Sequence, residues 1–385
     1  MSVLDIEKTD EELLSNVIKS CMKQNNKNVI VRTIHPVGQG AFYSERFIDE
    51  AGDSQFLMVY DCGSNSPRKL KREISSSIKE DEIINILFIS HFDYDHVNGL
   101  AYLKSKYRIE KVVMPLISSF DKCYYLLDLP LSLQNIVLNP QAFFEEDTII
   151  NYVNPIEDND EIVPLAENTI ASGTRLNLSC YADWCYIPFN YDGAARRKDL
   201  ETAFKKKGID IDWLEKRELD KMIENRSKIK DAYQSVCAGG ANEASLVLYS
   251  GPINESRICR WWNGERWNRY FDAVECNAAC LYLGDTDLNQ QVKGSNDMID
   301  SLFSHLAAVS HHIGTIQVPH HGSIKNFNHK ILTKWNIPKH YFASFGEKNT
   351  HGHPSSEVLE YIMRGNPFCG VTENRNSMAI EFIYL

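Results

Sequence analysis

Continuous apolar runs, separated by polar and turn-forming residues, dominate the chain and predict β-strands. Residues 56–60 and 281–283 have the composition of strands, and the run at 86–89 has the length of a strand that is fully buried. Residues 69–79 have helical spacing and lead to the strand at 86–89, and residues 109–114 predict the strand after it. This order of strands and helices predicts an α/β chain.

The start of the chain carries a separate helix signal. Thr9, with Glu12 three residues later, has the form of a capping box, and apolar spacing continues to about Met22. We expect a helical extension over residues 1–28, followed by the main domain at 29–385.

Composition narrows the class of protein. The chain has 385 residues, of which 43% are hydrophobic and 24% charged, as in ordinary globular proteins. A net charge of −11 gives no global positive field, so any contact with nucleic acid is expected to be local. The sequence has no apolar run long enough to span a membrane, no signal peptide, and ten cysteines without a Cys-x-x-Cys pair. We therefore expect reduced thiols and a cytoplasmic protein.

Two histidines and two aspartates directly follow the run at 86–89. They are His91, Asp93, Asp95 and His96, here called the metal motif. Burial alone gives no reason for four such groups, which are costly to desolvate unless they are paired. Imidazole and carboxylate are ligands of zinc, and of manganese when oxygen donors dominate. The alternation of His91 and Asp93, followed by adjacent Asp95 and His96, favours two divalent cations over a simple helix-capping turn.

The order His-x-Asp-x-Asp-His, with Gly99 three residues later, resembles the signature of the metallo-β-lactamase superfamily. Within that superfamily the chain is most similar to the metallo-β-lactamase domain of ComEC-type competence proteins, over about residues 30–115 and 240–385. The motifs that carry this resemblance occur in the same order: Val37–Gly40, Asp61-x-Gly63, Asn242-x-x-Ser245, Gly284-Asp285, His320–Ser323 and Ser344–Pro354.

The resemblance implies an α/β fold of the αββα type, a four-layer metallo-β-lactamase sandwich with the metals at strand ends between two mixed sheets. Residues 29–385 are then one metallo-β-lactamase-like domain, with a mostly helical insertion at about 116–240. We expect this insertion to cover the active site, where it could set substrate choice, or to bind a partner protein. Its basic clusters at 196–198 and 205–207 could contact phosphates, although interleaved charges are more typical of a solvated helix face.

The resemblance also implies the roles of individual residues. Two divalent ions, Zn²⁺ or Mn²⁺, are expected to be bound by His91, Asp93, Asp95, His96, Asp285 and His321, with Asp285 between the ions. Either residue of the pair His320 and His321 could be the ligand, and the other would face the substrate. Catalytic roles fall to Asp95, His320 and His353. Residues expected to orient the ligands or contact substrate are Asp61, Asn242, Ser245, Ser323, Asn349 and His351.

One ligand is missing from the expected set. Most of the superfamily supplies a third imidazole to the first ion, but this chain has no histidine between His96 and His305. The first site, with His91 and Asp93, is thus expected to be open, or completed by Asn242 or water. The second site is expected to be complete.

These residues predict a metal-dependent hydrolase. The resemblance favours a phosphodiesterase or nuclease in which a hydroxide bridging two metal ions attacks phosphorus. DNA or RNA is the first substrate expected, and the acidic net charge favours single strands or ends. The alternatives are a hydrolase of a small molecule (a nucleotide, phosphocholine ester, lactone or thioester) and a metal-binding sensor or partner subunit without turnover. The membrane channel of ComEC proteins is missing, so DNA uptake is not expected.

Overall fold

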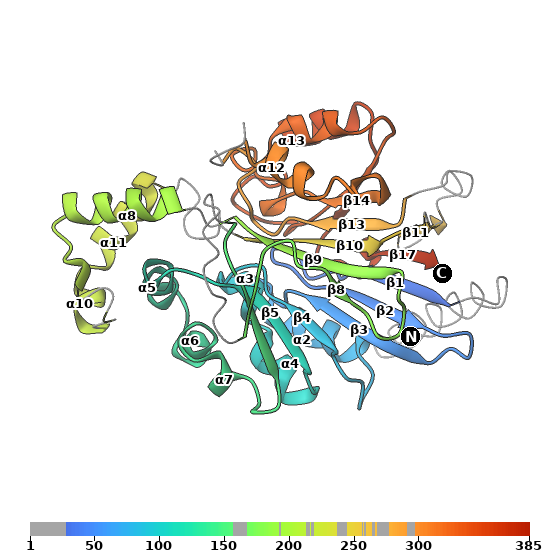
Figure 1. Ribbon diagram of the computed structural model, residues 1–385, viewed down its shortest axis with the longest axis horizontal. Helices are drawn as coiled ribbons and strands as arrows, with labels where there is room; N and C mark the ends of the chain where they lie inside the picture. Colours follow the sequence, from blue (N-terminus) through green and yellow to red (C-terminus); the bar gives the residue numbers. More distant parts are fainter. Residues whose placement is uncertain are drawn as a thin grey trace.

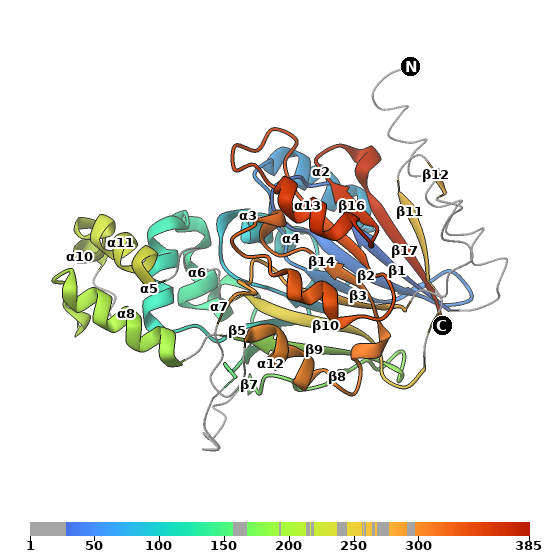
Figure 2. The same ribbon diagram turned by 90° about the horizontal axis from the view of Figure 1, so that it is seen from above.

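The computed structural model describes residues 28–156, 168–191, 194–212, 216, 219–236, 245–255, 257, 259–263, 266–267, 277–290 and 297–385. The predicted N-terminal helix lies outside the described residues, and so does Asn242. Within the described part, two β-sheets lie face to face, with helices on their outer sides (Figures 1 and 2).

The first sheet contains both ends of the described chain. Its strands β17, β1, β2 and β3 are antiparallel to one another, and β3 to β7 run parallel. The predicted strands at 56–60, 86–89 and 109–114 are confirmed as β3, β4 and β5. In spatial order the described strands are β12 (Arg266–Trp267), β11 (Cys259–Asn263), β17 (Ala379–Tyr384), β1 (Val29–Ile34), β2 (Tyr43–Ile48), β3 (Ser54–Tyr60), β4 (Ile86–Phe88), β5 (Lys111–Pro115), β6 (Ile149–Val153) and β7 (Thr169–Ile170).

The second sheet is also mixed. Strands β13 to β16 are parallel, whereas β8, β9, β10 and β13 are antiparallel neighbours. The predicted strand at 281–283 is confirmed as β13. In spatial order the described strands are β16 (Phe368–Val371), β15 (His340–Ser344), β14 (Ile313–Gln317), β13 (Ala279–Tyr282), β10 (Leu246–Pro252), β9 (Trp184–Asn190) and β8 (Leu176–Asn177).

Helices cover both outer faces. The described α-helices are α2 (Pro67–Ser77), α3 (Tyr94–Val97), α4 (Leu100–Lys106), α5 (Ser119–Asp128), α6 (Leu131–Leu138), α7 (Pro140–Phe143), α8 (Ala194–Lys206), α10 (Leu219–Glu224), α11 (Arg226–Val236), α12 (Met298–His305) and α13 (Ser356–Met363). Short 3₁₀ turns are η3 (Ser310–His312), η4 (His320–Gly322), η5 (His329–Lys334) and η6 (Arg375–Ser377). None of the described helices has the length and apolar character needed to cross a membrane.

Three of the four hydrophobic cores among the described residues define the layers. The central core combines buried side chains from both sheets. On one outer face Leu70 of α2 packs in the same core as Leu87 of β4. On the other, Leu302 of α12 and Ile362 of α13 share a core with Ile316 of β14. Two stacked sheets with helices on both outer faces make four layers, so the predicted αββα sandwich is confirmed.

The described part of the stretch 116–240 contains strands of both sheets as well as helices. Its strands β6 and β7 extend the first sheet, and β9 pairs with β10 in the second sheet. Its helices pack together at one end of the molecule, with the rings of Phe120 (α5) and Phe204 (α8) 5.3 Å apart (Figure 2). The insertion bounds of about 116–240 stay a prediction, and the sequence pattern did not reveal these strands, because their partners are distant in the chain.

A buried ionic network joins the two sheets. Arg32 on β1 donates hydrogen bonds to Glu45 on β2, at 2.7 Å, and to Glu381 on β17. Glu45 also accepts a hydrogen bond from Tyr282 on β13, and Glu381 accepts one from Thr315 on β14, both at 2.9 Å. The three charged side chains are fully buried. Buried charges require partners of this kind, and these partners fix one sheet on the other.

Candidate metal centre

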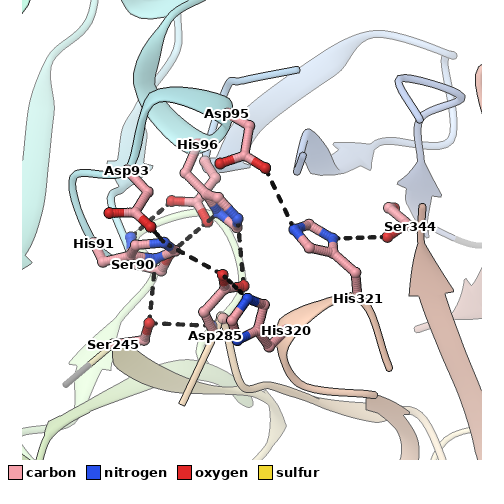
Figure 3. A network of polar contacts seen from close by, with 12 residues as sticks. Ser90, His91, Asp93, Asp95, His96, Ser245, Asp285, His320, His321 and Ser344 are labelled. Carbon is pink, nitrogen blue, oxygen red and sulfur yellow. Dashed lines mark hydrogen bonds and ion pairs between the residues drawn. The ribbon is translucent and has the colours of Figure 1, made fainter. Parts of the chain in front are cut away.

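The side chains of the candidate metal centre project from strand ends in the two facing sheets (Figure 3). The metal motif follows β4, Asp285 follows β13, and His320 and His321 follow β14. The carbonyl of Ser90 accepts a hydrogen bond of 2.7 Å from the first residue of β10, which ties the metal motif to the second sheet. The carboxyl ends of the strands therefore bring together residues that are more than 200 positions apart.

Asp285 lies at the middle of the cluster, and its two oxygens face different histidines. Oδ2 is 3.6 Å from Nε2 of His91 and 3.7 Å from Nε2 of His320. Oδ1 is 3.4 Å from Nε2 of His96. One carboxylate thus faces two separate groups of ring nitrogens.

The two other aspartates of the metal motif each lie near a histidine. Oδ2 of Asp93 is 3.9 Å from Nε2 of His91, and Oδ2 of Asp95 is 3.5 Å from Nε2 of His321. The first group therefore contains His91, Asp93 and one oxygen of Asp285. The second contains Asp95, His96 and His321, whose ligand atoms lie within 4.8 Å of one another, and His96 lies equally close to His91 and Asp285, so the two groups adjoin.

Contacts of Nδ1 outside the cluster set the ring orientation of His96 and His321. Nδ1 of His96 lies 2.9 Å from Oδ2 of Asp61, and Nδ1 of His321 lies 2.8 Å from the carbonyl oxygen of Ser344. Carboxylate and carbonyl oxygens accept hydrogen bonds, so each Nδ1 carries a hydrogen, and in the neutral ring each Nε2 holds the lone pair that faces the cluster. This is the orientation that a metal ligand requires.

His91 and His320 are held in the same way. Nδ1 of His91 lies 2.8 Å from Oγ of Ser90 and 3.2 Å from Oγ of Ser245. Nδ1 of His320 lies 3.0 Å from Oδ1 of Asn326. All four imidazoles therefore engage Nδ1 outside the cluster and turn Nε2 inward.

Burial gives a physical reason to expect cations here. Nε2 of His91 and Nε2 of His96 are buried and accept no hydrogen bond from any described residue. A buried polar atom without a partner is costly, and native proteins rarely keep one. Two ligands on one tetrahedral zinc ion, at bond lengths of about 2.0–2.2 Å, are separated by about 3.4 Å. The nitrogen–oxygen distances of 3.4 to 3.9 Å in the cluster are close to that separation, so the donor set fits divalent cations.

The pKa values of the cluster also favour binding of divalent cations. Burial lowers the pKa of His91 to about 3, so this imidazole is neutral and able to coordinate. Partial burial, together with the charges of Asp95 and Asp285, raises the pKa of Asp93 above its ordinary value. Burial alone would raise the pKa of Asp95, but the hydrogen bond from His321 outweighs it and lowers the pKa to about 2. Carboxylates this close repel one another, and a cation removes that repulsion.

The backbone is constrained at the same place. Asp61, His320 and His321 adopt φ values of 55°, 47° and 56°, in the left-handed region that non-glycine residues rarely occupy. Asp81 and Asn168 are the other such residues in the described chain. Conformations of this kind are costly and persist where the surroundings enforce them, often at functional sites.

The remaining predicted residues lie around this cluster. Ser245 accepts a hydrogen bond of 3.0 Å from the backbone N–H of Asp285, and Ser323 is buried within the turn that carries His320 and His321. Asn349 bonds to the backbone of His353 and so shapes its loop. The ring of His353 is 5.7 Å from that of His320, and the exposed His351 stacks on His353 at 5.9 Å.

Sequence reasoning missed three contributors behind the ligands: Ser90, Asn326 and the carbonyl of Ser344. Ser90 directly precedes the metal motif, and its hydroxyl donates to Asp61 at 2.6 Å while lying beside His91. Its position next to His91 was the one feature of the sequence that could have indicated this role. Nothing in the sequence distinguishes Asn326 from an ordinary loop residue.

Comparison with known proteins agrees with this geometry. Residues 48–163 match the sequence model of the family described as "Metallo-beta-lactamase superfamily". The match begins at the end of β2, ends beyond β6 and includes the metal motif. Residues 48–163 are therefore similar in sequence to the metallo-β-lactamase superfamily. No curated protein sequence matches the chain.

Two solved structures resemble the chain at a distance. Unliganded yeast PDE1 is 9% identical, with a TM-score of 0.43, and the alignment covers 93% of this chain and 100% of that one. A long form of RNase Z from yeast is 9% identical, with a TM-score of 0.28, and the alignment covers 76% of this chain and 32% of that one.

Proposed function

We propose that the chain is a metal-dependent phosphodiesterase or nuclease that uses two divalent cations, Zn²⁺ or Mn²⁺. The observation that carries this proposal is the position of Asp285, whose two oxygens face two groups of inward-turned Nε2 atoms. In this proposal His91 and Asp93 bind the first cation, Asp95, His96 and His321 bind the second, and Asp285 binds both. Proteins of the superfamily are typically hydrolases, which supports turnover over a purely structural metal.

The cations, when bound, make water acidic enough to attack at neutral pH and offset negative charge on a phosphoryl group. The chain's own residues provide the rigid frame. Asp61 and the carbonyl of Ser344 keep the lone pairs of His96 and His321 turned inward, and buried Asp285 fixes the distance between the two groups. Positions fixed in this way lower the cost of reaching the reactive geometry.

His353 is proposed to protonate the leaving oxygen. Its ring lies 5.7 Å from that of His320, and it is half-buried, so a substrate can reach it. Burial lowers the pKa of His353 to about 4, which leaves the free imidazole neutral at pH 7. A bound phosphate anion would favour the protonated form, because an opposite charge raises the pKa of a histidine.

The phosphodiester is proposed from the ComEC-type motifs, in particular the His-His-Gly-Ser turn and the loop that ends at His353. The net charge of −11 weakens long-range attraction of duplex DNA, so single strands, ends or short oligonucleotides are the proposed substrates.

A small-molecule substrate is the second candidate, and one cavity favours it. The cavity measures about 270 Å³ and is lined by Gln39, Asn65, Lys348, Asn349 and His351, among others. Its modest size suits a single small ligand better than a polymer, although none of the residues that line it belongs to the His/Asp cluster. None of its lining residues comes from the 116–240 stretch.

The test is hydrolysis by protein stripped of metal and reloaded with Zn²⁺ or Mn²⁺. Substrates are labelled single-stranded DNA, duplex DNA, RNA, bis-p-nitrophenyl phosphate and cyclic nucleotides. Asp95→Ala, purified in parallel, should lose the activity, whereas Glu80→Ala, which removes an exposed carboxylate, should keep it. Absence of bound metal, or equal activity in Asp95→Ala, would overturn the enzyme proposal. Activity on cyclic nucleotides alone would favour the second candidate.

A further inference from the structure

His320 and His321 are adjacent in sequence but face different groups of the candidate metal centre. Nε2 of His320 lies 3.7 Å from Oδ2 of Asp285, the oxygen that His91 also faces at 3.6 Å. Nε2 of His321 lies 3.5 Å from Asp95 instead. We infer that His320 binds the first cation, together with His91 and Asp93, and replaces the imidazole that the 97–304 interval does not provide. The inference rests on the proposed two-cation site.

The backbone explains how neighbouring side chains reach different groups. Both residues have φ values in the left-handed region, 47° and 56°, and their rings diverge, with centroids 6.0 Å apart and an interplanar angle of 73°. Figure 3 shows His320 beside Asp285 and His321 directed toward Asp95. The N–H of His320 donates to the carbonyl of Gly284 at 3.0 Å, which ties this turn to the loop that carries Asp285. The divergence is therefore built into the backbone.

The other ring nitrogen of His320 shows which tautomer is present. Asn326 is 3% exposed, and its Nδ2 donates to the carbonyl of Asp285 at 3.1 Å. Its Oδ1 consequently faces Nδ1 of His320 at 3.0 Å and can only accept a hydrogen bond. Nδ1 of His320 must carry the hydrogen, so in the neutral ring Nε2 holds a lone pair. That arrangement suits a ligand, whereas a neutral proton donor would need the hydrogen on Nε2.

The inference changes the expected character of the first site. With His320 it contains two imidazoles and two carboxylates, His91, His320, Asp93 and Asp285, a donor set that zinc accepts. The side chains of His320 and Asp93 are 23% and 32% exposed, compared with 1% for His91, so these two residues form the solvent-facing side of the first site. Asn242 is then not needed as a ligand.

The test compares cation binding in four variants. His320→Gly and His320→Asn are chosen because glycine and asparagine accept left-handed backbone. Each is stripped of metal and titrated with Zn²⁺ against a chromophoric chelator, and bound Co²⁺ is followed by its visible absorption. We expect one ion to bind as in the parent protein and the other to bind roughly 100-fold or more weakly, beyond the 10–100-fold usual for loss of a residue behind a ligand. His91→Ala should lose the same ion, and His353→Ala should keep both.

Double variants decide the assignment. His91→Ala combined with His320→Gly should lose no more than one ion, because both residues serve the same cation. His321→Ala combined with His320→Gly should lose both. Parental stoichiometry and affinity in His320→Gly and His320→Asn would overturn the inference, and so would loss of both ions in the His91 and His320 double variant. If the parent protein binds two ions but cleaves no phosphodiester, the proposed function fails while the ligand assignment stands.

If circular dichroism shows that the glycine and asparagine variants do not fold, cation binding is measured in Asn326→Leu instead. It removes the acceptor behind Nδ1 of His320 and should weaken one ion about 10–100-fold. Unchanged binding of both ions in Asn326→Leu would count against the inference.

Discussion

Nδ1 of His96 lies 2.9 Å from Oδ2 of Asp61, and neither side chain is exposed to solvent. The same carboxylate accepts hydrogen bonds from the backbone N–H and the hydroxyl of Ser90, at 2.7 and 2.6 Å. Asp61 thus orients His96 directly. It also holds Ser90, whose hydroxyl lies beside Nδ1 of His91. It does so from the end of β3, a strand next to the one that carries the metal motif.

Asp61→Asn is expected to weaken binding of the cation that faces His96. The amide can present an N–H to Nδ1, which would reverse the tautomer and place the hydrogen on Nε2. Loss of such a partner behind a ligand typically costs about 10–100-fold in metal affinity. Zn²⁺ titration of the metal-free protein measures this change, and Asp49→Asn, in an exposed turn, is the matched control. Equal affinities in the two variants would show that Asp61 does not set the orientation of His96.

Gly63→Ala is expected to displace the metal motif. A β-carbon at Gly63 would lie 2.2 Å from the carbonyl oxygen of Asp95, where backbone packs directly on backbone. Overpacking of this kind costs about 1–3 kcal/mol, occasionally more. Chemical unfolding of the metal-free protein measures the cost. Gly365→Ala is the matched control, because a β-carbon there meets nothing within 4 Å, and surface changes of this kind usually stay within about 0.5 kcal/mol. A Gly63→Ala protein as stable as the control would contradict the close packing.

The parts of the fold that sequence predicted are those with a local signal. Strands buried on both faces need continuous apolar runs, and 86–89 and 281–283 provide them. The strands of 116–240 carry weaker signals, since β7 and β8 have two residues each and β9 pairs with β10 far along the chain. Pairing between distant segments cannot be deduced from either segment alone.

In the candidate site, too, sequence predicted the residues with a local signal and missed those that depend on the fold. The metal motif is contiguous, so its ligand character was visible in sequence. The divergence of His320 and His321 was not, because it depends on two left-handed residues and on Asn326. The same limit applies to Arg32, which lies in an apolar strand and gave no sign of its buried partners on two other strands.

The ion pair between Glu82 and Arg46 makes stability depend on pH. Arg46 donates to both oxygens of Glu82, at 2.8 and 3.0 Å, and Ser54 donates at 2.7 Å. Burial alone would raise the pKa of Glu82, but these hydrogen bonds outweigh it and lower the pKa below its ordinary value of 4.5. Because the folded pKa is depressed, the stabilisation is complete above the unfolded pKa and is lost as pH falls through the folded one.

Glu82→Gln should therefore cost about 1.5–3 kcal/mol at pH 7, the usual contribution of hydrogen bonds to charged groups. The difference from the parent protein should shrink as pH falls below 4.5. Urea unfolding of both metal-free proteins at a series of pH values checks this, and Glu80→Gln, on the surface, should differ little at any pH. A penalty that stays constant from pH 7 to acid would mean that the charge of Glu82 contributes nothing.

His353→Ala is expected to slow cleavage selectively, according to the leaving group. A ribose oxygen leaves as a poor anion unless it is protonated, and a positioned proton donor contributes about 10²–10⁴-fold. The nitrophenolate released from bis-p-nitrophenyl phosphate is a stable anion and needs no proton. The variant should therefore lose most of its kcat on an oligonucleotide while it retains most of its kcat on the nitrophenyl ester. Its metal content should equal that of the parent protein, because His353 belongs to neither group of residues whose ligand atoms lie within 4.8 Å of one another.

His351→Ala is the matched control for this comparison. His351 stacks on His353 at 5.9 Å but is exposed, so its removal should change both rates little. Equal slowing of both substrates by His353→Ala would assign His353 to binding of the phosphoryl oxygens, since those oxygens are common to the two substrates. Loss of a cation in His353→Ala would instead make it a ligand or the support of one. Selective slowing with both cations retained is the outcome that identifies His353 as the proton donor. The leaving oxygen of the oligonucleotide needs a proton, whereas that of the nitrophenyl ester does not.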